Sequence, residues 1–421
     1  MQLEKPKLFG DSKSLIGVMA VLAIALMIHL AFLYQDYRSF IHKPFYFTTA
    51  KVLSQSTKNK HGRSYEVLKL HSKEGWTFYT VTYQKKSFQN SQVRLEIFPN
   101  VTITFWGYLG TFFVKSRIGQ IMPVSQGFKE YLLQEVASQH ENKALASFYN
   151  AIFFATPLDA SLRQKVSMLG ISHLVALSGF HLGILWGMIY GIGFWFYRFF
   201  QQRYFPYRYA LLDVGVVSMA FLAAYLWFVD FPPSLVRSFA MVLTGWFMLL
   251  LGMELLSFTF LLTVVAVLMA LFPSLMVSLS FWLSVAGVFY IFLVLQYAKS
   301  LHKMVITLIV IPLGIFVLML PIVHAVFGIT TAYQLLSPLL SLAFIPFYPA
   351  VIFLHLVGMG GLLDSGLAWL FDFPHGGTEY LLPFWALGLY VAMSIGAIWN
   401  RWLFGATLGT AMLYALYLFI I

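Results

Sequence analysis

The chain has 421 residues, of which 60% are hydrophobic and 10% are charged, and its formal net charge is +11. An average soluble domain has about 25% charged residues, so this composition excludes an ordinary water-soluble protein and favours an α-helical membrane protein. The absence of cysteine excludes disulfides, iron–sulfur clusters, thiolate metal sites and cysteine nucleophiles.

The first apolar stretch runs from Ser14 to Tyr34, and Lys5, Lys7 and Lys13 precede it. A secretory signal has an apolar core of only about 7–15 residues, followed by a cleavage site with small residues. This stretch is longer and lacks such a site. We therefore expect residues 1–34 to form a cytoplasmic N-terminus and an uncleaved membrane anchor.

Residues 35–125 have the pattern of a small all-β domain, because short runs of β-branched and aromatic residues alternate with polar turns. We expect strands at 45–52, 65–71, 76–83, 93–98, 101–105 and 110–114. This number of strands in so short a segment suits a closed or partly closed barrel of the OB type.

The same region is basic, because residues 35–134 contain 14 Lys or Arg against 5 Asp or Glu. A basic groove attracts the phosphates of a nucleic acid independently of sequence, and exposed aromatic rings stack on bases. The candidate DNA-binding residues are Lys58, Lys60, Arg63, Tyr65, Trp76, Lys85, Lys86 and Arg94. Two alternatives stay open: strand aromatics often belong to a core, and basic loops also bind anionic lipid.

Residues 126–170 predict soluble amphipathic helices that connect the β-domain to the membrane part. Apolar residues recur at helical spacing from Phe128 to Val136 and from Leu158 to Leu169. Pro157 and Asp159 are typical of a helix start.

Residues 171–421 contain nine further apolar stretches, so that we expect about ten or eleven membrane helices in all. A glycine-rich piece at 358–380, which contains Asp364, Asp372 and His375, is expected to be re-entrant or interfacial. Short loops rich in Lys or Arg favour the cytoplasmic side, and they lie around Arg203 and between Lys299 and Lys303. This orientation puts the N-terminus in the cytoplasm and residues 35–170 outside it.

The most specific motif is the segment Gly170–Leu185, which places His173 and His181 two helical turns apart with Ser178 between them. On one helix, residues at i+3 and i+4 are neighbours, so these side chains form an expected polar stripe at the start of a span. Hydrogen bonding and close packing between helices, with Gly179 at a contact, is the alternative. Two histidines alone supply too few ligands for a metal site.

A second cluster contains Asp230, Pro233 and Arg237. The proline breaks one helix before the next begins, and a guanidinium near the membrane boundary can bind phosphate through its planar fork. The alternatives are a snorkelling anchor or an ion pair between Asp230 and Arg237.

These motifs resemble the ComEC family of competence proteins. The first motif is similar in Gly170, His173, Ala176, Ser178, Gly179 and His181. The second is similar in Pro233 and Arg237, and a third in Pro273, Phe281, Leu283, Ser284 and Ala286. The resemblance implies a channel that carries single-stranded DNA through the bacterial inner membrane during natural transformation, with an OB-like domain in the periplasm.

Three features depart from the family pattern. Many members carry a C-terminal metallo-β-lactamase-like nuclease domain, which we expect this chain to lack. Many also have a disulfide in the OB-like domain, which a chain without cysteine cannot form. Ser341 stands where an asparagine is expected.

We expect a channel without covalent chemistry, cofactor or bound metal. No nucleotide-binding loop is recognisable, so a cytoplasmic motor or single-strand-binding protein is an expected partner, together with a periplasmic DNA receptor, membrane lipid and a second copy of the chain. The candidate channel or gate residues are His173, Ser178, Gly179, His181, Asp230, Pro233, Arg237 and Ser284. The alternatives are an intramembrane hydrolase that uses Ser178 with His181, and a secondary transporter for a small anion.

Overall fold

The computed structural model describes residues 9, 11–60, 63–84, 86, 88, 91–123, 127–250 and 257–420. Its contacts form two compact units. We call them the β-unit, which comprises Phe9–Glu130 and Thr263–Leu279, and the helical unit, which comprises Tyr131–Leu262 and Ser280–Ile421.

The β-unit begins with the long helix α1 (Ser12–His42), whose N-terminus is capped by the side chain of Asp11. At 1.5 Å per residue its 31 residues span about 46 Å, more than the roughly 30 Å hydrocarbon core of a bilayer. The last turns of α1 pack against the β-domain. Phe40, which is 1% exposed, packs against Trp76 and Phe112 of the β-domain.

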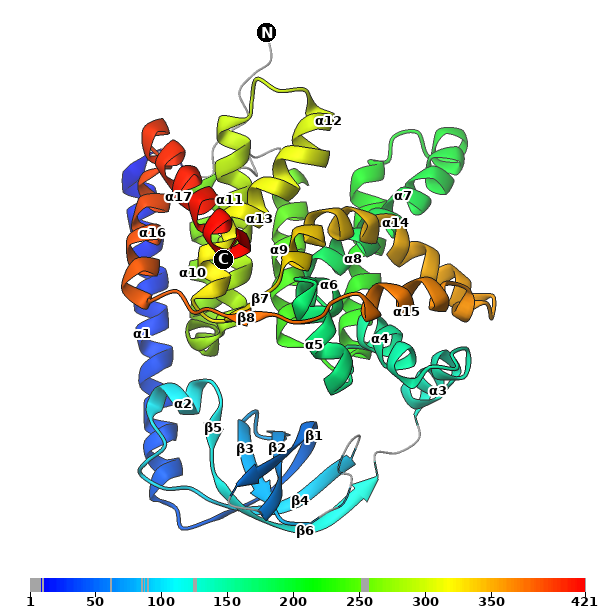
Figure 1. Cartoon of the computed structure of the whole chain (residues 1–421). Coiled ribbons are helices and arrows are strands. Elements are labelled where there is room, and N and C mark those ends of the chain that lie inside the picture. The colour runs from blue at the N-terminus through cyan, green and yellow to red at the C-terminus, as the bar shows by residue number, and fades with distance from the viewer. Residues whose placement is uncertain are drawn as a thin grey trace. The chain divides into compact units, whose positions relative to one another are not determined.

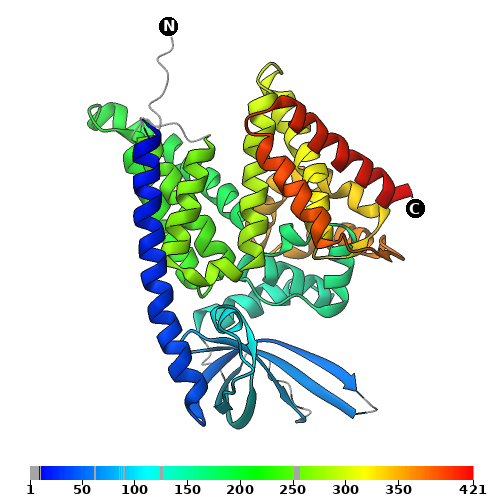
Figure 2. The ribbon, with the colours of Figure 1, turned by 90° about the vertical axis from the view of Figure 1, so that its left-hand side faces the viewer.

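The β-domain is a six-stranded sheet in the order β5-β3-β2-β1-β4-β6 (Figures 1 and 2). The strands are β1 (Tyr46–Lys60), β2 (Arg63–Ser72), β3 (Thr77–Thr82), β4 (Ser91–Phe98), β5 (Phe112–Phe113) and β6 (Lys115–Pro123). All neighbours pair antiparallel except β3 and β5, which are parallel.

The two edges of this sheet are consecutive segments of the chain, because only Val114 separates β5 from β6. The sheet therefore curls until β3 also contacts β6, with Thr80 Oγ1 2.7 Å from Ser116 Oγ. Strand residues alternate between core and surface, as they do along β4. The core includes Leu68, Leu70, Phe78, Val93 and Ile97, all fully buried.

The strand expected at 101–105 is wrong. Asn100 accepts hydrogen bonds from the backbone and the hydroxyl of Thr102 at 3.2 and 2.5 Å, which makes a local turn of the kind that competes with sheet pairing. Thr104 then caps helix α2 (Phe105–Leu109) through the amide of Gly107. In addition, β1 extends further than expected, and β6 was not expected as a separate strand.

The expected connecting helices are present as α3 (Phe128–Ser138), α4 (Lys143–Phe154) and α5 (Ala160–Met168). Asp159 caps α5 by accepting from the amide of Ser161 at 3.1 Å, as the sequence predicted. Their apolar faces enter the main core of the helical unit, in which the fully buried Tyr348 reaches the carbonyl of Ile152.

Each of the ten expected spans contains a helix among its described residues, but these helices differ in length. In the described part of the chain, seven helical segments are long and apolar enough to cross a membrane. They are α1, α7 (Gly179–Tyr204), α8 (Ala210–Phe228), α11 (Leu279–Tyr297), α12 to α13 (Lys303–His324), η3 to α14 (Ala332–Leu356) and α17 (Arg401–Ile420). The shorter ones are α9 (Pro233–Leu250), α10 (Phe258–Leu271) and α16 (Phe384–Gly396). The total of ten or eleven membrane helices stays a prediction.

The segment expected to be re-entrant or interfacial is ordered. It contains the 3₁₀ turn η4 (Gly360–Leu363), helix α15 (Asp364–Asp372) and strand β8 (Thr378–Glu379), which pairs with β7 (Ile329–Thr330). Within the helical unit α7, α8 and α9 pack on one another, and α14 packs on α7 (Figure 1). The N-terminal ends of α7, α9 and α14 are the scaffold of the site described next.

Candidate functional site

The first motif begins at a sharp corner after α5. Gly170 has a φ of +68°, a left-handed conformation that glycine adopts without steric cost. A Cβ on this residue would also lie 3.3 Å from Cγ of Gln334. The Ser337 hydroxyl donates to the Gly170 carbonyl at 3.0 Å, so the corner is fixed to the start of α14.

The expected single helical stripe from His173 to His181 is wrong, because the helix is interrupted. His173 lies on α6 (Ser172–Val175), and α7 begins only at Gly179. Ala176 and Ser178 have extended backbone between these helices. Ser178 is the N-cap residue of α7, and its amide and hydroxyl each lie 3.4 Å from His181 Nδ1.

His173 contacts Ser341, the residue that departs from the family pattern. Its Nε2 lies 3.1 Å from the Ser341 Oγ, and this hydroxyl donates to the Ser337 carbonyl at 2.8 Å. A serine hydroxyl has a single proton. Ser341 therefore accepts from His173 while it donates to Ser337.

Gly179 allows α7 and α9 to approach closely. A Cβ on Gly179 would lie 2.9 Å from the Oγ of Ser238 and 3.2 Å from its Cβ. One turn earlier on α9, Ser234 donates to the carbonyl of Leu177 at 2.7 Å. The N-terminal end of α9 is thus fixed against the break between α6 and α7.

His181 is fully buried between α7 and α14. The rings of Phe344 and Tyr348 meet its ring edge to face, with centroids 5.1 and 4.9 Å away. Its Nε2 has no hydrogen-bond partner in the described chain. A buried polar atom without a partner costs free energy, so this nitrogen is a candidate for contact with a ligand.

Arg237 is the second buried polar residue of this region. It lies in the first turns of α9 and is 4% exposed, and its guanidinium is 5.9 Å from the ring centroid of Phe281 on α11. Neither Nε nor Nη1 has a hydrogen-bond partner among the described residues. Because the side chain is buried, it is not a snorkelling anchor.

The other candidate gate residues lie nearby in the chain. Asp230 is exposed at the end of α8, with a φ of +65°. Pro233 is the first residue of α9, as its helix-starting role predicts, and its side chain lies outside the described set. Ser284 is half-buried on α11, one turn after Phe281.

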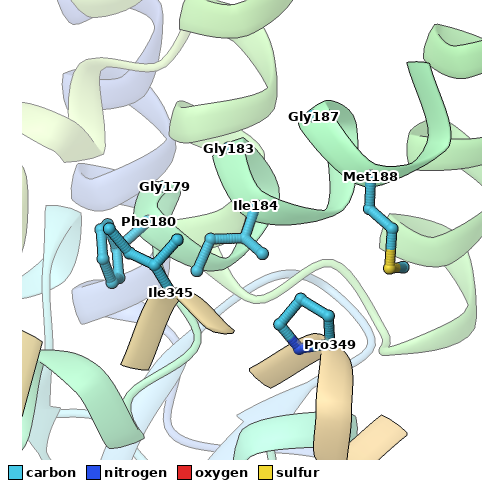
Figure 3. A pocket seen from close by; sticks show the side chains of 8 residues that line it. All are labelled: Gly179, Phe180, Gly183, Ile184, Gly187, Met188, Ile345 and Pro349. Carbon is cyan, nitrogen blue, oxygen red and sulfur yellow. The ribbon is translucent and has the colours of Figure 1, made fainter. Parts of the chain in front are cut away.

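A groove of about 550 Å³ runs between α7 and α14. Figure 3 shows the glycines of α7 on one side and Ile345 and Pro349 of α14 on the other. A Cβ at Gly183 or Gly187 would meet no atom within 4 Å, so these glycines leave an open apolar surface. Glycine recurs at every fourth position from Gly179 to Gly187, a pattern in the sequence that the sequence analysis did not use.

Those candidate DNA-binding residues of the β-unit whose side chains the structure describes lie at separate places on the sheet. Lys58 and Tyr65 are opposite each other near the end of the β1–β2 hairpin, and Arg94 is exposed on β4. Trp76 is half-buried and donates to the Tyr108 hydroxyl at 3.1 Å, so it packs with the core aromatics. Lys86 is exposed. Lys85 lies outside the described residues, as do the side chains of Lys60 and Arg63.

The structure also shows a row of residues that the sequence analysis did not bring together. On the outer face of the sheet Lys69 of β2, Tyr79 of β3 and Phe113 of β5 are neighbours in register. Tyr79 and Phe113 are 40% and 53% exposed, and the Lys69 ammonium lies 5.8 Å from the Tyr79 ring centroid. Only strand pairing reveals this row, since the three residues are far apart in sequence.

The geometry gives little support to a serine hydrolase. In such enzymes the histidine that activates the serine is oriented by a third group at its other nitrogen. Here His181 presents Nδ1 to Ser178 at 3.4 Å, and Nε2 has no partner in the described chain.

Comparison with known proteins gives one family. The sequence profile described as "Competence protein" matches residues 155–420. A curated relative, an uncharacterized protein of Aquifex aeolicus (strain VF5), is 24% identical over 286 residues, which cover 67% of this chain and 61% of the relative. The chain thus spans about three fifths of the length of the curated relative it matches. No solved structure matches the chain.

Proposed function

The chain belongs to the competence protein family, and we propose that it forms a membrane channel that carries single-stranded DNA into the cytoplasm during natural transformation. The channel lies in the bacterial inner membrane, with the N-terminus in the cytoplasm and the β-domain in the periplasm. It has no enzymatic activity of its own. The long apolar helices support its place in a membrane.

The observation that carries the proposal is the buried Arg237. A buried cation whose donors lack acceptors is unfavourable, yet Nε and Nη1 of Arg237 have no hydrogen-bond partner in the described chain. A passing phosphate would supply the missing acceptors, and arginine binds phosphate with good geometry. The residue therefore suits a transient anionic cargo better than a permanent structural contact.

The surrounding helix ends add to the positive potential. Ser238, the neighbour of Arg237, contacts the first residue of α7, and His173 on α6 contacts the first turns of α14. The ends of α7, α9 and α14 that meet here are N-termini, which carry partial positive charge and unpaired amides. DNA phosphates would encounter these ends together with Arg237.

The β-domain is proposed to be an OB-type barrel that receives the strand outside the membrane. If β5 and β6 count as one interrupted strand, its order is 1-2-3-5-4-1 with a parallel pair between the third and fifth strands. OB folds bind oligonucleotides on the face of strands 2 and 3, which here carries Lys69 and Tyr79. Stacking on Tyr79 and Phe113 is independent of sequence, as DNA uptake requires.

The remaining partners follow from what the channel needs. Translocation requires a source of free energy, and the sequence has no recognisable nucleotide-binding loop. We therefore place a motor or single-strand-binding protein at the cytoplasmic end and a DNA receptor at the periplasmic end.

The test uses cells in which a variant of the gene replaces the wild-type gene. It measures the uptake of fluorescent DNA, with periplasmic and cytoplasmic signals scored separately. Arg237→Met is expected to leave DNA in the periplasm, whereas Arg237→Lys retains part of the uptake. Arg401→Met is the matched control, because Arg401 is exposed at the start of α17. Normal uptake by Arg237→Met, at equal protein level in the membrane, would overturn the proposal.

A further inference from the structure

A second cluster of titratable side chains lies away from the channel site, within the helical unit. His140 lies between α3 and α4, His355 near the end of α14, and Asp364 at the start of α15. His140 Nδ1 is 3.0 and 2.9 Å from the two carboxylate oxygens of Asp364. On the other side of the ring, His140 Nε2 is 3.0 Å from His355 Nε2.

The positions of the ring protons follow from the partners of the two Nδ1 atoms. His355 Nδ1 is 2.7 Å from the carbonyl oxygen of Val351, which can only accept. The ionised carboxylate of Asp364 also only accepts. Both Nδ1 atoms must therefore carry a proton, and in two neutral rings both Nε2 atoms would present lone pairs to each other.

Two nitrogen lone pairs that face each other at 3.0 Å repel, unless a cation lies between them. Zn²⁺ bound tetrahedrally by two imidazole nitrogens at about 2.0–2.1 Å would hold them about 3.3 Å apart. The observed 3.0 Å is instead within the usual range of about 2.7–3.2 Å for a hydrogen bond donated by N–H. The described residues also contain no group of three or more ligands that could hold a metal. The geometry favours a proton.

The surroundings suit a single positive charge. The carboxylate of Asp364 balances it at 2.9 Å. Tyr149 of α4 stacks on His140, with ring centroids 4.4 Å apart and planes at 7°, and burial, together with the nearby Asp364, raises the pKa of Tyr149 so that it stays neutral. The neutral side chain of Gln139 holds the same elements together, since it donates to the His355 carbonyl and accepts from the Gly360 amide.

We propose that His140 and His355 form a binding site for one proton, which they share between their Nε2 atoms and which Asp364 stabilises. The bound proton clamps the α3–α4 connection to the end of α14. When it leaves, the two lone pairs repel and the clamp opens. This inference does not depend on the nature of the cargo, although α14 also carries Ser341 and Tyr348 of the channel site.

The first test measures thermal unfolding of the full chain in detergent between about pH 6.5 and about pH 8, where free histidines lose their protons. Over this range the two histidines of the unfolded chain lose their protons, whereas the folded pair keeps the one proton that it shares. The free energy of unfolding must therefore fall as pH rises. We expect the unfolding temperature of the wild type to fall by several degrees.

Two variants replace the shared proton by a hydrogen bond between neutral groups. His355→Gln places a neutral amide N–H against His140 Nε2. Asp364→Asn can donate to His140 Nδ1, which moves the ring proton to Nε2. Both are expected to fold and to lose the pH-dependent fall, whereas His375→Gln, at an exposed histidine, keeps the behaviour of the wild type. If both variants titrate like the wild type, the proposal is wrong.

Nitrogen NMR of histidine-labelled protein gives an independent result, because protonated and bare ring nitrogens differ in chemical shift. Near pH 6 we expect one imidazolium signal that is absent from both His355→Gln and Asp364→Asn and present in His375→Gln. Elemental analysis of the purified protein tests whether the cation between the two rings is a metal ion instead of a proton. A stoichiometric transition metal that is lost in His355→Gln would replace the proton and overturn the proposal.

Discussion

Gly179 at the start of α7 lies so close to Ser238 of α9 that a Cβ on the glycine would be 2.9 Å from the serine Oγ. At this distance a methyl group fits only if the Ser238 side chain or one of the two helices shifts. The contact joins the two sequence motifs that are most specific in this chain, and it makes the position of Arg237 depend on Gly179.

The first prediction concerns this contact. Gly179→Ala is expected to destabilise the protein by about 1–3 kcal/mol, the usual cost of overpacking, and to reduce DNA uptake. Gly183→Ala is the matched control on the same helix, because a Cβ there meets nothing within 4 Å. Thermal unfolding in detergent measures the difference. Ser238→Gly should partly rescue Gly179→Ala, and equal stability of the two alanine variants would contradict the observed packing.

The second prediction concerns the hydrogen bond between His173 and Ser341, which joins α6 to α14. Ser341→Ala is expected to cost about 1 kcal/mol, the usual net value of a hydrogen bond. Ser341→Asn, which keeps an acceptor, should cost less. A double-mutant cycle with His173→Ala measures the coupling between the residues, and a coupling energy near zero would show that this contact contributes nothing.

The third prediction concerns Ser178, because its substitution has different expected effects in a channel and in a hydrolase. Ser178→Ala is expected to leave DNA uptake largely intact and to cost about 1 kcal/mol of stability through loss of an N-cap residue. Serine-directed probes should label the wild type and Ser178→Ala equally weakly. Selective labelling of the wild type at Ser178, together with loss of uptake in the variant, would favour the hydrolase.

The fourth prediction concerns the outer face of the β-domain. Tyr79→Ala and Phe113→Ala are each expected to weaken binding of single-stranded DNA to the full chain by about 1–3 kcal/mol, the usual value of one stacked base. Trp106→Ala is the matched control, an exposed aromatic on α2. Fluorescence anisotropy measures the affinity. An equal effect of all three changes would show that this row is not a specific platform.

The fifth prediction concerns the charges of the same domain. Lys69→Gln and Arg94→Gln are expected to weaken binding to all DNA sequences alike and to reduce the dependence of affinity on salt, because each removes one phosphate contact. Measuring the affinity at several salt concentrations tests this. If the salt dependence is unchanged, these two cations do not face the phosphates.

The parts of the fold that were predictable depend on local pattern. Apolar stretches long enough for a membrane and the alternation along β2, β3 and β4 are visible in the sequence, because burial imposes a fixed period on each element. The prediction was wrong at 101–105, where Asn100 and Thr104 bond to nearby backbone amides. It was also wrong in placing His173 and His181 on one helix, because the extended residues Ala176 and Ser178 interrupt the helix between α6 and α7.

The sequence by itself determined the class of the protein, the approximate place of its helices and strands, and the family motifs, since each of these depends on residues close together in the chain. Tertiary structure alone decided which residues meet. His173 finds Ser341 across 168 positions and His140 finds His355 across 215, and the row from Lys69 to Phe113 exists only because β3 pairs with both β2 and β5. No local period records such contacts, because they arise from the packing of whole helices and strands.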